Sequence, residues 1–168
     1  RAFEDRYRGS REEIKGRLKA YFPYIAPLKT METSPNALDL GCGRGEWVEL
    51  MQQSGYGILG VDLDDGMLAA CAELHLPVSK AEVLETLHLQ DDGSLALVTG
   101  FHIAEHLPFE VLQTLAQQAL RVLKPGGLLI LETPNPENLV VGTNNFYLDP
   151  SHIRPLPPLL LSFLLEHT

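Results

Sequence analysis

Cysteine is scarce: the chain of 168 residues contains only two, Cys42 and Cys71. Two thiols are too few for a disulfide framework, and nothing in the sequence pairs them. That usage is typical of a reducing compartment, so we expect a cytoplasmic protein. Long apolar runs are also missing. The most apolar stretch, residues 156–165, is about ten residues, whereas a membrane-spanning helix needs about 20, and we predict no membrane span.

Basic residues are few as well. Thirteen Lys and Arg stand against 22 Asp and Glu, which gives a formal net charge of −9. A protein that grips a nucleic-acid backbone usually carries a basic patch or stripe. Here Lys and Arg gather only in residues 6–19, interrupted by acids. We interpret that run as a solvated helix face rather than a polyanion site, and expect no nucleic-acid partner.

Helical and strand patterns alternate along the chain. Residues 10–22 have a helical pattern, with Ser10 and Glu13 spaced as a capping box requires. After it, apolar runs that predict strands alternate with amphipathic segments that predict helices. The strands are expected at residues 37–40, 57–61, near 78, 95–99 and 128–131, and the helices at 46–54, 64–74, 82–87 and 108–123. Five such alternations predict an α/β fold with helices on both faces of a parallel sheet.

Two segments lie outside this alternation. Residues 124–127, Lys-Pro-Gly-Gly, are predicted to form a turn before the last strand. Residues 133–158 are rich in Pro and Asn and read as a long loop, which in a compact domain is usually functional. Residues 159–166 then form an apolar helix.

A glycine-rich turn follows the first predicted strand, in the segment LDLGCGRG at residues 38–45. Glycines between a strand and a helix let the backbone approach a ligand closely, and ligands of open parallel sheets bind beyond the carboxyl ends of the strands. Asp62 ends the next strand, 21 residues after Gly41. A carboxylate there can accept hydrogen bonds from the two ribose hydroxyls of an adenosine. The alternative role for Asp62 is a helix N-cap, for which Asp64 is better placed.

Two classes of nucleotide ligand remain open at this point, dinucleotides and S-adenosylmethionine (SAM). The dinucleotide fingerprint is G-x-G-x-x-G at a helix start that stabilises pyrophosphate. The spacing here is G-x-G-x-G, and Glu46 follows at once. An acid at the helix start repels a phosphate but tolerates the cationic end of a sulfonium amino acid. The charge therefore favours SAM.

Taken together, five segments resemble motifs of the class I SAM-dependent methyltransferases, in the same order and over nearly the whole chain. These are LDLGCGRG at residues 38–45, GVDLDDGML at 60–68, AEVLETL at 81–87, TGFHIAEHL at 99–107 and LRVLKPGGLLILETPN at 120–135. The resemblance implies a three-layer Rossmann-like sandwich with strand order 3-2-1-4-5. Its domain would cover residues 31–168, with residues 1–30 as an N-terminal helical segment or lid.

The resemblance also implies which residues bind SAM. Gly41 and Gly43 would approach the methionine part, Asp62 would hold the ribose, and Glu82 would read the adenine. Glu82 departs from the family, which more often has Asp there. The full set of cofactor-binding residues implied is Asp39, Gly41, Cys42, Gly43, Asp62, Leu63, Met67, Glu82, Val83, Gly100, Phe101 and His102.

Methyl transfer from a sulfonium mainly requires that the nucleophile be aligned and water excluded, and a base only where the nucleophile must lose a proton. The candidate catalytic residues are His102, His152 and Arg154. The candidate acceptor-binding residues lie at the N-terminus and in the long loop: Arg8, Arg11, Asn135, Tyr147, His152 and Arg154. Arg11 has the alternative of pairing with acids in its own helix. No His/Cys cluster has the spacing of metal ligands, so no metal is expected.

The acceptor is suggested by two segments, YRGSRE at residues 7–12 and FYLDPSHIRPLPP at 146–158. They are similar to segments of methyltransferases from bacterial surface-polysaccharide and O-antigen gene clusters. That likeness implies a saccharide acceptor methylated on oxygen, either a sugar hydroxyl or a sugar-linked phosphate, in lipopolysaccharide biosynthesis. Arginines suit the phosphate alternative, because a guanidinium can donate two parallel hydrogen bonds to a phosphate group.

The sequence leaves two alternative functions open: an NAD-dependent oxidoreductase with a similar sheet, and a SAM-binding module without catalytic activity. We expect the family's last two strands, 6 and 7, to be missing from this sequence, and the first residue is not Met. We therefore expect a fragment of a longer chain. Either its continuation or a partner chain would cover the edge of the fifth strand, because an exposed apolar edge invites pairing.

Overall fold

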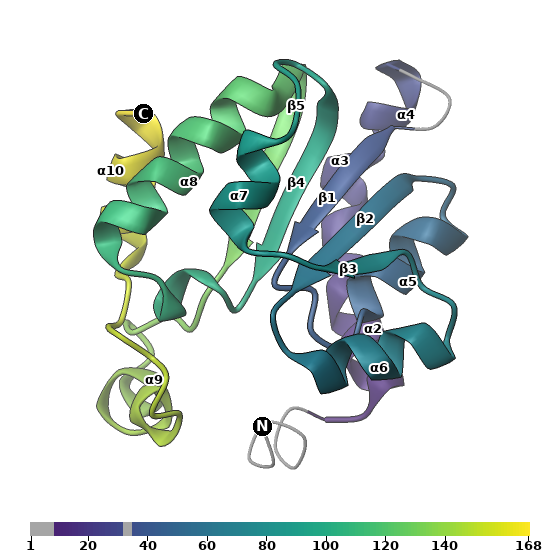
Figure 1. The fold of residues 1–168 in the computed structure, drawn as a ribbon. Coiled ribbons are helices and arrows are strands. Elements are labelled where there is room, and N and C mark those ends of the chain that lie inside the picture. Colours follow the sequence, from purple (N-terminus) through teal and green to yellow (C-terminus); the bar gives the residue numbers. More distant parts are fainter. Residues whose placement is uncertain (1–8, 32–34) are drawn as a thin grey trace.

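The computed structural model describes residues 9–31 and 35–168, and Figure 1 shows their arrangement. Five parallel strands form one sheet in the order β3-β2-β1-β4-β5. The strands are β1 (Asn36–Leu40), β2 (Gly57–Asp62), β3 (Val78–Lys80), β4 (Leu95–Phe101) and β5 (Leu123–Glu132). The predicted α/β class and strand order are confirmed.

Helices cover both faces of the sheet (Figure 1). One face packs against the N-terminal helices, α5 and α6, through a core that includes Ala37, Trp47 and Met51. The other packs against α7 and α8, through Leu38, Leu87 and Leu115 among others. The helices are α2 (Arg11–Leu18), α3 (Phe22–Ile25), α4 (Leu28–Met31), α5 (Glu46–Gln53), α6 (Asp65–Glu73), α7 (Val83–His88), α8 (Phe109–Val122), α9 (Leu139–Thr143) and α10 (Pro158–Glu166).

The β4 strand shows why the sheet lies between two layers. All seven of its residues are buried, which is typical of a parallel strand covered on both faces. Neighbouring β1 sends Ala37 into one core and Leu38 into the other, as the alternation of side chains along a strand requires.

The helix starts follow their sequence signals. Ser10 and Glu13 form the predicted capping box of α2, with reciprocal backbone and side-chain bonds. Asp64 caps α6 by accepting the amides of Gly66 and Met67. The predicted continuous helix over residues 10–22 is wrong in its later part. α2 ends at Leu18, a 3₁₀ turn (Lys19–Tyr21) follows, and Pro23 lies in the first turn of α3, where a missing amide proton does no harm.

Two other expectations need correction. Residues 124–127 are not a separate turn, because β5 runs from Leu123 to Glu132 and contains them as a bulge between its pairings with Leu95 and Leu97. The left-handed φ of +83° at Gly126 bends the strand there. Residues 133–158 are not all loop, since they contain α9 and a 3₁₀ turn (Asn145–Leu148). Asn138 caps α9 through the amides of Val140 and Val141.

The β5 strand forms one edge of the sheet, and no strand from the described part of the chain pairs with its outer side. Cover of that edge by further residues or a partner stays a prediction. No described helix has the length and apolarity to cross a membrane. The division at residue 30 also stays a prediction; α2 packs directly on α5 of the main layer.

Candidate active site

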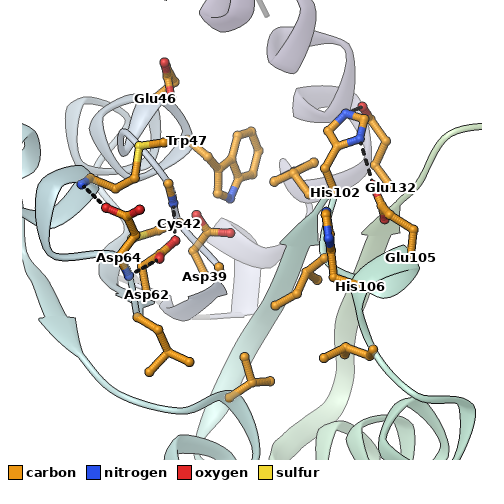
Figure 2. A pocket seen from close by; sticks show the side chains of 18 of the residues that line it. Asp39, Cys42, Glu46, Trp47, Asp62, Asp64, His102, Glu105, His106 and Glu132 are labelled. Carbon is orange, nitrogen blue, oxygen red and sulfur yellow. Dashed lines mark hydrogen bonds and ion pairs between the residues drawn. The ribbon is translucent and has the colours of Figure 1, made fainter. Parts of the chain in front are cut away.

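A cavity of about 660 Å³ opens at the carboxyl ends of the strands. This is where ligands of open α/β sheets bind, because the loops that leave the strands converge there. Figure 2 shows the residues of two opposed walls. One wall comes from the ends of β1 and β2 with the start of α5, and the other from the ends of β4 and β5.

The glycine-rich turn and Asp62 meet on the first wall. Gly41 and Gly43 have left-handed φ angles of +69° and +53°, which side chains disfavour. Asp62 accepts the Gly43 amide through Oδ2 at 2.8 Å and the Asp64 amide through Oδ1 at 2.8 Å. A carboxylate has about four lone-pair sites, so each oxygen of Asp62 can still accept another hydrogen bond from a ligand.

Trp47 gives this wall a buried donor without a partner. Its side chain is 2% exposed and lines the cavity, and Nε1 has no hydrogen-bond partner in the described part of the chain. The indole packs against Phe101, at 5.2 Å between ring centroids, and against Tyr21 and Phe22. A buried N–H without a partner is rare in proteins, so this donor is an observation in favour of a bound polar ligand.

Glu46 lies beside Trp47 at the start of α5. Its side chain is buried and lines the cavity, and Arg44 Nε lies 2.8 Å from its Oε1. The start of this helix therefore presents a carboxylate, which does not suit a pyrophosphate.

His102 on the second wall is held between two carboxylates. Its Nδ1 lies 3.3 Å from Glu105 Oε1 and its Nε2 lies 3.1 Å from Glu132 Oε1 (Figure 2). Its backbone has a left-handed φ of +57°, rare outside glycine. The hydrogen bonds of Glu105 and then Glu132 raise the pKa of His102 to about 9. His102 is thus an imidazolium at neutral pH and a poor acceptor of protons.

Glu105 is a buried carboxylate, 1% exposed, that also accepts the Thr133 hydroxyl at 2.9 Å. Burial by itself would raise its pKa, but the hydrogen bonds and charge of His102 and the hydroxyl of Thr133 outweigh burial and hold the pKa below its usual range. Glu105 is therefore a fixed negative charge in the wall of the cavity.

His152 reaches the same wall from the segment after β5. Its Nδ1 lies 2.6 Å from the Phe146 carbonyl oxygen, and its Nε2 lies 3.9 Å from both Glu105 Oε1 and Asp149 Oδ2. The ring packs between His106, at 4.7 Å, and Phe146, at 4.5 Å. The Nδ1 contact orients the ring so that Nε2 faces the carboxylates.

Most of the predicted cofactor residues line this one cavity, and so does His152. Gly100 does not; a Cβ there would meet Ile103 at 2.9 Å and Leu131 at 3.1 Å, so its role is close packing of the sheet. The predicted residues that line the cavity are Asp39, Gly41, Cys42, Gly43, Asp62, Leu63, Met67, Glu82, Val83, Phe101, His102 and His152. Glu82 has a second task, since it caps α7 through the amides of Leu84 and Glu85.

The predicted acceptor residues are mostly elsewhere. Arg154 lies over the Phe109 ring, 4.6 Å from its centroid, and Tyr147 is 64% exposed. Asn135 accepts the Glu137 amide. None of these three lines the cavity. Arg8 lies outside the described residues.

Arg11 joins α2 to the start of α5 instead of facing the cavity. Its guanidinium donates to Glu49 Oε2 at 2.7 Å and to the carbonyls of Arg44 and Gly45. The alternative that it pairs within its own helix is also wrong, because Glu49 belongs to α5.

Replacing Arg11 with methionine is expected to lower the free energy of unfolding by about 1–2 kcal/mol, since a charged donor to three acceptors is lost. Chemical denaturation measures this, and Lys19→Met, exposed at the end of the same helix, is the matched control. An unchanged stability with a raised KM for the acceptor would instead restore the predicted role in acceptor binding.

Sequence reasoning missed several lining residues. Glu132 ends β5 at the same edge as Asp62, so the rule about carboxyl ends could have found it. Ile14, Arg17 and Leu18 of α2 carry no local signal, because only packing brings that helix over the cavity. Glu132 also accepts the Tyr21 hydroxyl, which ties the N-terminal segment to β5.

Three features define the class of Rossmann-like domains that bind an adenosyl ligand. They are the strand order, the glycine turn joined to the acidic residue that ends β2, and the cavity above them. A sequence model described as a methyltransferase domain matches residues 9–166. The chain belongs to this methyltransferase family, and S-adenosylmethionine is the cofactor.

Similar proteins of known structure and of curated sequence agree. A SAM-dependent methyltransferase from Archaeoglobus fulgidus is 37% identical, with a TM-score of 0.86 over 99% of this chain and 72% of that chain. A probable SAM-dependent methyltransferase from Mycolicibacterium smegmatis is 30% identical over 78% of this chain and 50% of its own length. A ubiquinone biosynthesis O-methyltransferase from Idiomarina loihiensis is 34% identical over 58% of this chain and 42% of its own length. The chain thus spans half or less of these curated relatives.

The solved structure of WbdD is similar in fold, at 21% identity with a TM-score of 0.65 over 73% of this chain and 30% of that chain. An identity this low supports the fold and no more.

Proposed function

We propose that this domain transfers the methyl group of SAM to an oxygen of a small-molecule or saccharide acceptor. The observation that carries the proposal is a single cavity with two unlike walls. The glycine turn, Asp62 and the free donor of Trp47 form one wall, and the ionisable groups around Glu105 form the other. One wall suits a nucleoside, and the other suits a polar acceptor.

The residues present fit the cofactor. Asp62 would accept the ribose hydroxyls, and the turn at Gly41 and Gly43 would approach the methionine part. The Trp47 N–H supplies a donor for a polar atom of the ligand. Among the other lining residues of this wall, Leu63 would lie beside the ribose, and Met67, Glu82 and Val83 would surround the adenine.

Bound SAM supplies an activated methyl group on a positively charged sulfur. The protein's own part is to align the acceptor oxygen with that methyl and to keep water away. His102, held as an imidazolium by Glu105 and Glu132, would contribute a positive charge to this wall, because both of its N–H groups are directed at those carboxylates and neither nitrogen can take the proton of the acceptor. His152 is the better candidate for the proton of a hydroxyl, because its Nε2 faces the cavity wall and its Nδ1 is engaged.

The choice of oxygen rests on two likenesses. Segments 7–12 and 146–158 resemble methyltransferases of surface-polysaccharide clusters, which favours a sugar hydroxyl or sugar-linked phosphate in cytoplasmic lipopolysaccharide biosynthesis. The curated relatives named as ubiquinone biosynthesis O-methyltransferases also favour oxygen, there in a different kind of acceptor. Arg11 and Arg154 do not line the cavity, whereas Arg17 does, so a sugar hydroxyl and a sugar-linked phosphate are both proposed as acceptors.

The test is a screen with radiolabelled SAM against sugar hydroxyl, sugar phosphate and phenol acceptors. We expect label on the oxygen of one acceptor class. For a hydroxyl acceptor, His152→Gln should lower kcat by about 100-fold or more, the usual contribution of a general base. His88→Gln, an exposed histidine on α7, is the matched control.

The other outcomes separate the alternatives. SAM binding without transfer to any acceptor would favour a non-catalytic module. Tight NAD binding without SAM binding, measured by calorimetry, would favour an oxidoreductase and overturn the proposal.

A further inference from the structure

Two histidines and a buried carboxylate meet on the second wall of the cavity. Glu105 and His106 come from the 3₁₀ turn after β4 (Ala104–His106), and His152 comes from the segment after β5. One ligand atom from each of these three residues lies within 4.8 Å of the other two. Figure 2 shows Glu105 and His106 beside the end of β4, across the cavity from Asp62.

Each of the three side chains is oriented by a second partner. His152 Nδ1 contacts the Phe146 carbonyl at 2.6 Å, His106 Nδ1 contacts Ser151 Oγ at 3.1 Å, and Glu105 Oε2 accepts the Thr133 hydroxyl at 2.9 Å. Metal-binding histidines in proteins nearly always have such a partner on the other ring nitrogen, because it sets the tautomer and the direction of the lone pair. Here Nε2 is the nitrogen left for a ligand on both rings.

The two segments that supply the residues are joined by their backbones as well. The Ile153 amide donates to the Glu105 carbonyl at 2.8 Å, so the residue after His152 is fixed against the turn that carries Glu105 and His106. Asp149 adds a nearby carboxylate, with Oδ2 3.9 Å from His152 Nε2, and it accepts the Ser151 hydroxyl. Burial alone would raise the pKa of Asp149, but the Ser151 hydrogen bonds and the neighbouring histidines lower it, so it too is anionic.

We propose that Glu105, His106 and His152 bind a divalent transition-metal ion. Two imidazoles and one carboxylate are ligands that suit Zn²⁺, Mn²⁺ or Fe²⁺, whereas Mg²⁺ and Ca²⁺ prefer oxygen alone. In a tetrahedral zinc site the ligand atoms lie roughly 3.4 Å apart, since each bond is about 2.1 Å. Side-chain rotations that move the ligand atoms by about an ångström would therefore bring this cluster to coordination distance.

Three protein ligands leave a coordination position open, and all three residues line the cavity, so that position faces it. An oxygen of the acceptor would fill it; this last step alone rests on the proposed function. The ion would lower the pKa of a bound acceptor hydroxyl and orient it toward the methyl group. Because His152 Nε2 would then be bound to the ion, the ion would replace His152 as the group that promotes loss of the hydroxyl proton. Asp149 is the nearest candidate for a fourth protein ligand.

The site competes with an existing contact. Glu105 Oε1 lies 3.3 Å from His102 Nδ1 and 3.9 Å from His152 Nε2. A bound ion would either share Glu105 Oε1 with His102 or take the place of His102 as the partner of that oxygen. No metal-ligand spacing is visible in the sequence, because His152 lies 46 positions after His106 and only the fold brings them together.

The test uses the full chain, stripped with a chelator and titrated with Co²⁺ and Zn²⁺ alone, without SAM or acceptor. We expect one equivalent of Co²⁺ to bind with visible d–d absorption bands, and Zn²⁺ to displace it. His152→Gln and His106→Gln should each weaken binding by at least tenfold, while His88→Gln should bind as the parent chain does. SAM binding by every variant checks that it is folded.

Co²⁺ and Zn²⁺ affinity that is equal in all four proteins would overturn the proposal, as would no binding at millimolar metal. Binding of Mg²⁺ as tight as that of Zn²⁺ would overturn the assignment to imidazole ligands. None of these results touches methyl transfer itself, so failure here and failure of the proposed function are told apart.

Discussion

Replacing Asp62 with alanine is expected to weaken SAM binding by about 2–4 kcal/mol, or roughly 30- to 900-fold in Kd. Two charge-assisted hydrogen bonds to the ribose would be lost. The structure adds a second reason, because Asp62 also accepts the amides of Gly43 and Asp64 and so holds the glycine turn in place. Calorimetry with SAM measures the effect.

Two controls separate these reasons. Asp62→Asn keeps the size and one acceptor oxygen, so it should keep one of the two backbone hydrogen bonds, lose the charge, and weaken binding less than Asp62→Ala does. Asp65→Ala removes a carboxylate that is 80% exposed at the start of α6 and bonded to Lys80, and it should bind SAM normally. If Asp62→Ala binds SAM as tightly as the parent chain, Asp62 does not belong to the cofactor site.

Replacing Gly45 with alanine is expected to lower the free energy of unfolding by about 2–5 kcal/mol. Gly45 caps α5 with a left-handed φ of +75°, a conformation that costs other residues roughly 1–2 kcal/mol. An added Cβ would also lie 2.7 Å from Leu76 Cδ1 and 2.8 Å from Cys71 Sγ, and such overpacking costs about 1–3 kcal/mol. Denaturant unfolding gives the difference.

Gly93→Ala is the matched control, because Gly93 also has a positive φ, +58°, but nothing lies within 4 Å of an added Cβ. It should lose only about 1–2 kcal/mol, the cost of the backbone conformation. Equal losses in the two variants would mean that the contacts with Leu76 and Cys71 do not matter.

Local signals predicted much of the framework. The capping box of Ser10 and Glu13 and the N-cap at Asp64 are confirmed because a cap needs only residues two or three positions apart. The alternation of apolar runs and the order of five motifs predicted the sheet, which the structure confirms. The approach of Asp62 to the glycine turn followed from the rule that parallel strands end at one edge. The ribose role of Asp62 stays a prediction.

Long-range contacts were beyond local signals. Arg11 was expected at the acceptor, but packing of α2 on α5 gives it Glu49 and two carbonyls. His102 was expected as a catalytic residue, and only its position between Glu105 and Glu132 makes it an imidazolium. Local patterns do not report the contacts of Arg11 with Glu49 or of His102 with Glu132, because these partners lie on elements that are far apart in the sequence.

What the amino-acid sequence determined by itself is the α/β class, the glycine turn and the acid after the second strand, since each depends on neighbours along the chain or on the period of apolar residues. Only the tertiary structure decided the second wall of the cavity. Glu105, His106 and His152 meet there because parallel β4 and β5 deliver their following segments to the same edge. His152 and the pair Glu105 and His106, far apart in the sequence, then line one cavity, and their distances together with their residue types determine what the wall can bind.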